Sequence, residues 1–211
     1  MEKERIGNTE IVFFRSRCGN LDEVSNWIEN KNFDVNSTDK IGCTALHMAS
    51  QGGNDELIRY LLSKGADIDK KTQCRDPEVS GATPLVYAVM LGNVDAAKTL
   101  IQHGASIDVK LNNNNLLDIS IDSNNPEMIS VILSIGYNID NPGVMNMTPL
   151  SLAFSKDKYL SAKFLLENRA DYRKYQSDNY TSPLYAVQEK GETYRCTSLL
   201  LRHVGRTFWN I

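Results

Sequence analysis

One sequence pattern returns at nearly constant spacing, and it constrains the fold more than any other feature of the chain. The block Thr-Ala-Leu-His-Met-Ala at 44–49 returns as Thr-Pro-Leu-Val-Tyr-Ala at 83–88 and as Thr-Pro-Leu-Ser-Leu-Ala at 148–153. Each copy is followed by an apolar-periodic run and then by a Gly-Ala-Asp turn or a variant of it. A period of about 33 residues indicates stacked copies of one small unit.

The recurring block, the apolar run and the Gly-Ala-Asp turn together resemble the ankyrin repeat family, and the resemblance covers nearly the whole chain. It implies an all-α fold, an α-solenoid of helix-turn-helix units joined by β-hairpin loops. We place about six repeats, at 5–37, 38–70, 77–109, 110–142, 143–175 and 176–211, in a single domain spanning 1–211. The register of the last repeat is ambiguous by one residue.

The residues of the block explain why it starts a helix. Thr44 can accept a hydrogen bond from a free backbone N–H of the first turn. Pro84 and Pro149 come next in their own copies, at the first helical position, where proline costs no hydrogen bond. Arg169 stands where other repeats place a helix-ending glycine, so we expect a strained or rebuilt turn there. Repeat four lacks the threonine, proline, histidine and small alanine together, and we expect it to open first.

Composition excludes several classes of protein. The net charge is −3, and charges of both signs are interspersed, which argues against a nucleic-acid binder. No run reaches the roughly 20 apolar residues of a membrane span, and the charged start at 1–5 leads us to expect no secretory signal. The four cysteines, Cys18, Cys43, Cys74 and Cys196, lie in different repeats, and we expect free thiols. We therefore expect a cytoplasmic protein, also nuclear in some cases, or one acting in a host cytosol if it is a secreted effector.

No residue pattern supports catalysis, cofactor binding or a metal site. The three histidines have no cysteine, histidine or carboxylate partner at metal-ligand spacing. The resemblance implies a structural, hydrogen-bonding role for His47. Phosphate-binding glycine motifs are absent from the sequence. We expect no catalytic residue, no cofactor and no metal, and an enzyme is a remote alternative.

The resemblance implies a groove, formed by hairpin tips and first helices, that binds folded proteins or peptides. Mapped onto this chain, it predicts a set of partner-binding residues drawn from repeats two to five: Lys40, Ile41, Gln51, Val79, Ser80, Met90, Leu91, Leu111, Asn112, Asp122, Val144, Met145, Met147 and Lys156. Apolar side chains from three adjacent repeats belong to this set. We interpret them as one exposed apolar patch, with local packing inside each hairpin as the alternative.

Two further features are candidates for recognition or regulation. Six extra residues enlarge the loop at 71–80, and insertions in solenoids often lie on the binding face. A surface insertion without function is the alternative, and in either case we expect deletion of 72–77 to leave stability nearly unchanged. Asn36 resembles the hairpin asparagine that asparaginyl hydroxylases modify in this family, and a simple turn residue is the alternative reading.

The sequence therefore predicts a non-catalytic protein–protein interaction module that serves as an adaptor, inhibitor or effector. The partner is expected to be a folded protein or a peptide segment with an apolar anchor. We expect neither nucleic-acid nor membrane binding, and a monomer. Narrower alternatives are a regulator resembling the inhibitor-of-NF-kappa-B proteins and a microbial or viral effector that modulates a host.

Overall fold

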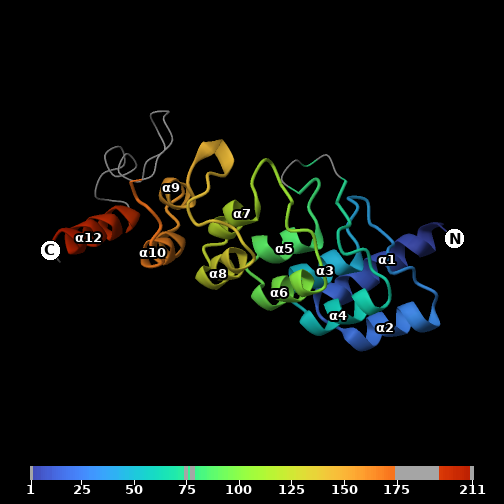
Figure 1. The fold of residues 1–211 in the computed structure, drawn as a ribbon. Helices are drawn as coiled ribbons and strands as arrows, with labels where there is room; N and C mark the ends of the chain where they lie inside the picture. The colour runs from blue at the N-terminus through green and yellow to red at the C-terminus, as the bar shows by residue number, and fades with distance from the viewer. Residues whose placement is uncertain (1, 74–75, 77–78, 174–194, 210–211) are drawn as a thin grey trace. The chain divides into compact units, whose positions relative to one another are not determined.

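The structure is a computed structural model that describes residues 2–73, 76, 79–173 and 195–209 (Figure 1). The chain divides into two compact units, unit 1 at Met1–Asn112 and unit 2 at Asn113–Ile211. Each unit is built from pairs of short antiparallel helices, which confirms the all-α class. Of the predicted sixth repeat at 176–211, only residues 195–209 lie within the described residues.

The described part of unit 1 contains three helix pairs, in which an inner helix is followed by an outer helix (Figure 1). The inner helices α1, α3 and α5 pack side by side, and the outer helices α4 and α6 also pack on each other. Leucines of both layers, such as Leu46, Leu85 and Leu100, are fully buried between them. The bounds are α1 Glu2–Arg17, α2 Leu21–Asn30, α3 Ala45–Gly52, α4 Asp55–Ser63, α5 Pro84–Met90 and α6 Val94–Gln102.

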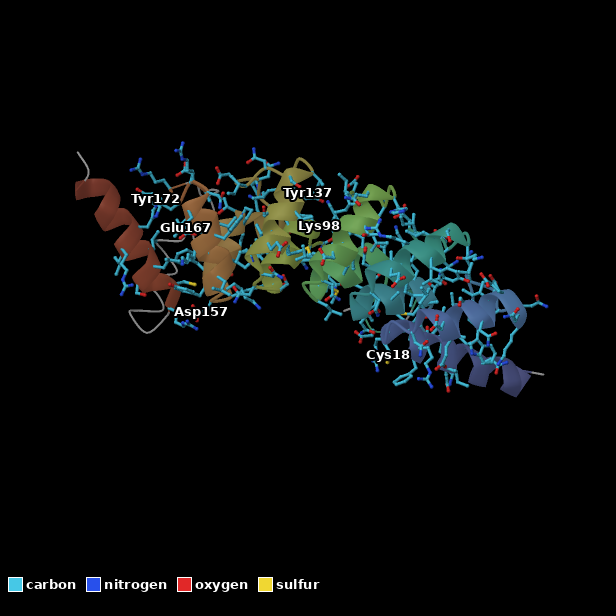
Figure 2. The ribbon with its side chains drawn as sticks, turned by 90° about the horizontal axis from the view of Figure 1, so that it is seen from below. Cys18, Lys98, Tyr137, Asp157, Glu167 and Tyr172 are labelled. Carbon is cyan, nitrogen blue, oxygen red and sulfur yellow. The ribbon has the colours of Figure 1, made fainter. Side chains whose placement is uncertain are left out.

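Unit 2 repeats this plan and adds a longer helix at its end. Inner helix α7 packs on α9, outer helix α8 on α10, and α10 on α12. Figure 2 shows Asp157, in the turn between α9 and α10, at the opposite edge of this unit from Glu167 and Tyr172. The bounds are α7 Leu116–Asp122, α8 Pro126–Ser134, the 3-10 helix η1 Val144–Asn146, α9 Pro149–Ser155, α10 Tyr159–Glu167 and α12 Arg195–Trp209.

The expected helix starts are present. The Thr148 hydroxyl accepts a hydrogen bond from the Ser151 N–H at 3.2 Å, and Pro149 occupies the first turn of α9. Thr83 and Pro84 play the same roles in α5. Of the described helices, none has the length and apolar character needed to cross a bilayer.

In unit 1, an asparagine side chain before each of the outer helices α4 and α6 contacts the preceding helix pair. The Asn54 amide donates to the carbonyls of Ser16 and Arg17 at 3.0 and 2.9 Å. Asn93 donates in the same way to Ser50 and Gln51, at 2.9 Å each. These carbonyls lie at the C-terminal ends of the preceding inner helices, where helix geometry leaves them without intrahelical partners. We call this contact the inter-repeat joint.

Unit 2 forms its inter-repeat joint with a different residue. Lys158 precedes α10, and its Nζ donates to the Asp122 carbonyl at 2.7 Å. The lysine therefore satisfies the same kind of helix-end carbonyl that an asparagine satisfies in unit 1. A cation at this place also interacts favourably with the negative end of the helix dipole.

The start of repeat four is rebuilt around Asp118, which occupies the position of His47. The Asn115 side chain accepts from the Asp118 N–H at 3.0 Å, and Asp118 Oδ2 accepts from the Asn115 N–H at 3.1 Å. The same Oδ2 accepts from the Val144 N–H of the next repeat at 3.1 Å. Repeat four has thus lost the usual residues but retains a reciprocal helix cap.

The enlarged loop at 71–80 is anchored at its base. Thr72 is buried, its N–H donates to the Ala82 carbonyl at 3.0 Å, and the Gly81 N–H donates to the Thr72 carbonyl at 2.9 Å. The Thr72 hydroxyl also accepts from the Ala82 N–H at 3.0 Å. This anchoring argues against the expectation that deleting 72–77 leaves stability nearly unchanged, because the deletion would remove a buried, hydrogen-bonded residue.

Candidate protein-binding surfaces

The predicted residues of unit 1 lie on loops and inner helices, and their exposure differs. Lys40 and Ile41 are exposed in the loop between the first two helix pairs, with Ile41 at 37%. Leu91, at the end of α5, is 53% exposed. Gln51, Val79, Ser80 and Met90 are half-buried. Leu91 and Ile41 are thus the large apolar side chains of this set that unit 1 presents to solvent.

Lys40 and Ile41 border a pocket of about 930 Å³ that lies entirely within unit 1. Residues from α1, α2, α3 and the loop at 31–41 line it. Its large apolar side chains are Phe13, Phe14, Trp27, Phe33, Ile41 and Met48. We call this the N-terminal pocket. Its volume falls in the range of ligand-binding clefts.

Sequence reasoning missed most of the N-terminal pocket, although a signal was present. Aligning Gly19 with Gly53 places Phe14 and Met48 at the same position of successive repeats, on the adjacent helices α1 and α3. Both side chains line the pocket, and Phe14 is 53% exposed. Two large apolar residues at one repeat position, next to the small Ala49, could have indicated an apolar surface.

For one residue, the prediction of an exposed side chain is wrong. Leu111 was expected to contribute to an exposed apolar patch, but it is only 5% exposed and belongs to the buried apolar residues. Its neighbour Asn112 is exposed, with a left-handed φ of 52° that asparagine tolerates. The local packing that we considered as the alternative therefore holds for Leu111.

In unit 2 the predicted apolar residues lie in the short helix η1 and directly after it. Met145 is 78% exposed, whereas Val144 and Met147 are half-buried. The Val144 N–H is bound by Asp118, and the Met147 N–H donates to the Val144 carbonyl at 3.0 Å. Met145 has a φ of 52°, which is unusual for a residue other than glycine, asparagine or aspartate. The loop thus holds one methionine in an unfavourable backbone conformation with its side chain in solvent.

The two charged candidates of unit 2 contact each other. Lys156 Nζ lies 2.6 Å from Asp122 Oδ2, and both side chains are about 40% exposed. This ion pair reduces the charge that either residue can offer to a partner. Exposed pairs of this kind contribute little to stability, so they can be broken on binding.

His47 has the structural role that the resemblance implied. Its Nδ1 accepts from the Thr44 N–H at 3.1 Å, and its Nε2 lies 3.3 Å from the Ala82 carbonyl of the next repeat. Because a backbone N–H can only donate, the neutral ring carries its proton on Nε2. Burial lowers the pKa of His47 to about 4. The ring is therefore neutral near pH 7, with both nitrogens in use.

The described residues contain no group of three side chains suited to hold a metal ion. Of the four cysteines, Cys18, Cys43 and Cys196 are free thiols, and Cys74 lies outside the described residues. Burial, together with a hydrogen bond to Asp157, raises the pKa of Cys196 to about 12. That thiol is protonated at neutral pH, which disfavours a nucleophilic role.

Asn36, the candidate hydroxylation site, bridges two repeats. Its Oδ1 accepts from the Asp67 N–H at 2.8 Å, and its Nδ2 donates to the Gly65 carbonyl at 3.0 Å. Asp69 and Asp140 accept from backbone N–H groups of following repeats at the matching place. A structural use of Asn36 is therefore present, and its modification stays a prediction.

Comparison with known proteins gives consistent matches. A family model described as ankyrin repeats (3 copies) matches residues 12–113 and 70–143. Ankyrin repeat protein FPV223 of fowlpox virus (strain NVSL) is 31% identical over 121 residues, which cover 57% of this chain and 81% of that protein. Alpha-latrocrustotoxin-Lt1a of Latrodectus tredecimguttatus is 29% identical over 177 residues, which cover 81% of this chain.

The chain spans only 12% of the toxin's length and 36% of a second fowlpox protein, FPV014, to which it is 26% identical. Among solved structures, the human ASB11 ankyrin repeat domain superposes with a TM-score of 0.75. That match covers 91% of this chain and 82% of the human chain at 24% identity. The structural likeness therefore concerns the fold.

Proposed function

This chain belongs to the ankyrin repeat family, and on that premise we propose that it is a non-catalytic adaptor, inhibitor or effector. It would hold a protein partner on the loops and inner helices of its repeats. The ankyrin repeats themselves indicate a protein–protein interaction module. The narrower statement, that particular exposed residues form the binding surface, is the part we propose.

The observation that carries the proposal is Met145. A solvent-exposed methionine adds nothing to the core, and a left-handed residue costs on the order of 1 kcal/mol in folding. Met145, at a loop tip of unit 2, therefore carries a conformational cost that no burial of its side chain offsets. Strain of this kind concentrates at functional sites, and methionine suits an adaptable binding surface.

Replacing Met145 by glycine separates a binding role from a structural one. We expect Met145→Gly to raise the free energy of unfolding by about 1 kcal/mol, because glycine adopts the left-handed conformation freely. We expect the same change to weaken capture of the natural partner in quantitative affinity purification from cells. The control is Arg169→Gly, which removes a similar backbone strain after α10, where Arg169 has a φ of 66°. This variant should leave partner capture unchanged.

Unchanged capture by Met145→Gly would remove Met145 from the binding surface. Equal losses with both variants would show that flexibility alone affects binding. Either result would remove the observation on which the proposal depends. The purified protein should also show no turnover that is abolished by replacing His47, because both nitrogens of that ring are engaged in the fold.

The similarity to two fowlpox virus proteins favours one narrower reading, an effector that modulates a host. An inhibitor-of-NF-kappa-B-like regulator is the other. We propose a monomer that works in the cytoplasm and binds neither nucleic acid nor membranes. Sedimentation analysis and imaging of a tagged chain test oligomeric state and location directly.

A further inference from the structure

The loop at 143–147, which we call the repeat-five loop, projects from unit 2. Its short helix η1 stands beyond α7 and α9, on the side away from α8 and α10 (gold in Figure 1). Among the large apolar side chains of the described residues, none is more exposed than Met145. The loop therefore offers a single apolar side chain to another molecule.

The same turn occurs one repeat earlier without a methionine. Asn112 and Met145 both lie three residues before the N-cap of their inner helix, and both have a φ of 52°. The next residues, Asn113 and Asn146, are also left-handed, with φ of 65° and 59°. Asparagine tolerates this conformation better than methionine does. The backbone of the turn thus gives no reason for methionine at 145.

Hydrogen bonds within the repeat-five loop fix its shape. The Gly143 N–H donates to the Met147 carbonyl at 2.8 Å, and the Asn146 N–H donates to the Gly143 carbonyl at 3.2 Å. With the bond from Met147 to Val144, three backbone hydrogen bonds close a segment of five residues. A loop that is ordered before binding loses less conformational entropy when it binds.

A carboxylate from the preceding repeat also holds this loop. In repeat two the loop residue Asp39 accepts from two N–H groups of its own loop, at 2.9 Å each. The matching residue of repeat five, five positions before the N-cap, is Gly143, which has no side chain. Asp118 takes over: its Oδ2 accepts from the Val144 N–H at 3.1 Å, and its Oδ1 fills the space beside Gly143. Asp118 thus fixes the loop from outside it.

The loop presents no charge. Residues 141–155 contain no charged side chain. The charges that act on Asp118 are those of Asp122 and Lys156, which pair with each other at 2.6 Å. Val144 and Met147, on either side of the tip, are apolar and half-buried. An uncharged tip of this kind is stabilised by apolar surface, and a concave surface covers a single projecting side chain most completely.

We propose that the repeat-five loop inserts Met145 into an apolar pocket of a partner protein, and that Asp118 is the residue that positions it. The inference rests on the proposed function, because it assumes a protein partner. It adds the direction of insertion and the chemistry of the partner. This chain supplies the projecting side chain, and the partner supplies the pocket.

Site-specific cross-linking in the full chain tests where Met145 goes. An aliphatic amino acid that carries a diazirine replaces Met145 by stop-codon suppression, in cells that contain the partner. Illumination should link position 145 to apolar residues that line a hollow in one other protein. Mass spectrometry of the linked peptides identifies both the protein and the residues.

Binding of the cross-linked protein, purified, then tests the chemistry of the tip. Met145→Leu should keep the affinity within about threefold, because it conserves apolar volume. Met145→Gln has a similar length but is polar, and it should weaken binding about tenfold. That loss should be the same at low and high salt, because the exchange changes no charge. The matched control Leu160→Gln, at an exposed leucine of α10, should change nothing.

A double-variant cycle tests the positioning role of Asp118. Asp118→Ser should weaken binding about fivefold and increase the mobility of the 143–147 amides in NMR relaxation. In the Met145→Gln background the same change should have little further effect, since no anchor remains to be positioned. Glu167→Ser, which removes an exposed carboxylate from α10 (Figure 2), should leave affinity and loop mobility unchanged. Circular dichroism on every variant checks that the helices are intact.

Several results would overturn the inference. These are the absence of cross-links, links to polar residues or to a second copy of this chain, and equal affinities of Met145→Leu and Met145→Gln. An undiminished effect of Asp118→Ser without the methionine would remove its positioning role. If Met145→Gly still weakens partner capture in these cases, only this inference falls. If it does not, the proposed function falls as well.

Discussion

Single residues of this protein show where the repeat is held together by buried polar groups. His47 is the clearest example, because it ties the start of α3 to the carbonyl of Ala82 in the next repeat. This role was predicted from the resemblance to the ankyrin repeat family, because His47 stands at the histidine position of the family's Thr-Pro-Leu-His block. Leu111 could not be placed in the same way, because it lies in a loop where no periodicity indicates which side chains fold inward.

The lowered pKa of His47 predicts a pH dependence of stability. The folded ring stays neutral down to about pH 4, whereas the unfolded ring takes up a proton below about 6.5. The unfolded state therefore binds more protons in this window, and the free energy of unfolding falls as the pH is lowered. Between pH 7 and 4.5 we expect a loss of about 2–3 kcal/mol from this residue.

Urea unfolding of the wild type and of His47→Gln at several pH values measures this contribution. The variant is less stable at pH 7, because it disturbs a buried hydrogen-bonded side chain. It should nevertheless show a flatter dependence between pH 6.5 and 4.5. Parallel curves for the two proteins would assign the pH dependence to other groups.

Arg169 is a second residue with a measurable cost. It has a φ of 66° at the position where Gly65, Gly104 and Gly136 end three other helix pairs. The sequence left open whether this turn is strained or rebuilt, and the backbone conformation is the strained one. We expect Arg169→Gly to stabilise the protein by about 1 kcal/mol, and the reverse kind of change, Gly136→Ala, to destabilise it by a similar amount. Thermal unfolding of both variants tests the pair of expectations.

At the scale of elements, the start of α7 shows how a repeat can lose its usual residues and keep its cap. The block at 115–120 lacks threonine, proline and histidine, but Asn115 and Asp118 restore the reciprocal hydrogen bonds. The Asp118 carboxylate accepts a hydrogen bond from the Val144 N–H of the next repeat, whereas the His47 ring contacts the Ala82 carbonyl. The sequence indicated the loss, and the cap that replaces it is a local pair three residues apart. The additional contact to Val144 joins two repeats, and no local pattern reveals it.

This contact requires a glycine in the facing loop. A Cβ at Gly143 would lie 2.1 Å from Asp118 Oδ1, far inside the contact distance. We expect Gly143→Ala to destabilise unit 2 by about 2 kcal/mol, because a buried carboxylate cannot move away without losing its hydrogen bonds. Asp118→Ser should relieve the clash, so the double variant is expected to be about 1 kcal/mol more stable than additivity predicts. Purely additive effects in urea unfolding would contradict this coupling.

At the scale of the whole molecule, strained backbone is distributed unevenly. Among the described residues, non-glycine residues with a left-handed φ in unit 1 are Asn32 and Asn112. Unit 2 has more of them: Asn113, Asn124, Met145, Asn146, Asp157 and Arg169. Each such residue other than asparagine or aspartate costs on the order of 1 kcal/mol. Unit 2 is therefore expected to be the less stable of the two.

Hydrogen exchange measured by mass spectrometry at increasing urea concentration tests this order. Peptides from α7 to α10 should lose protection before peptides from α3 to α6, because local stability governs exchange. The result also tests our expectation that repeat four opens first. Equal protection in the two units would contradict both statements.

The helix pairs could be predicted because the residues that pack them recur with the period of the fold. The N-terminal pocket could not, because it depends on which large side chains occupy the remaining positions. Phe14 and Met48 are ordinary apolar residues in the sequence, and only the neighbouring helices and the loop at 31–41 turn them into one surface. Recognition thus uses the positions at which the repeats differ.

The inter-repeat joint has a consequence for how such chains change length. Asn54, Asn93 and Lys158 each belong to the later repeat of the two that they connect. A duplicated segment would therefore carry its own donor for this contact. The helix end that receives the donor must also leave room for it, as Gly19 does for the Asn54 amide.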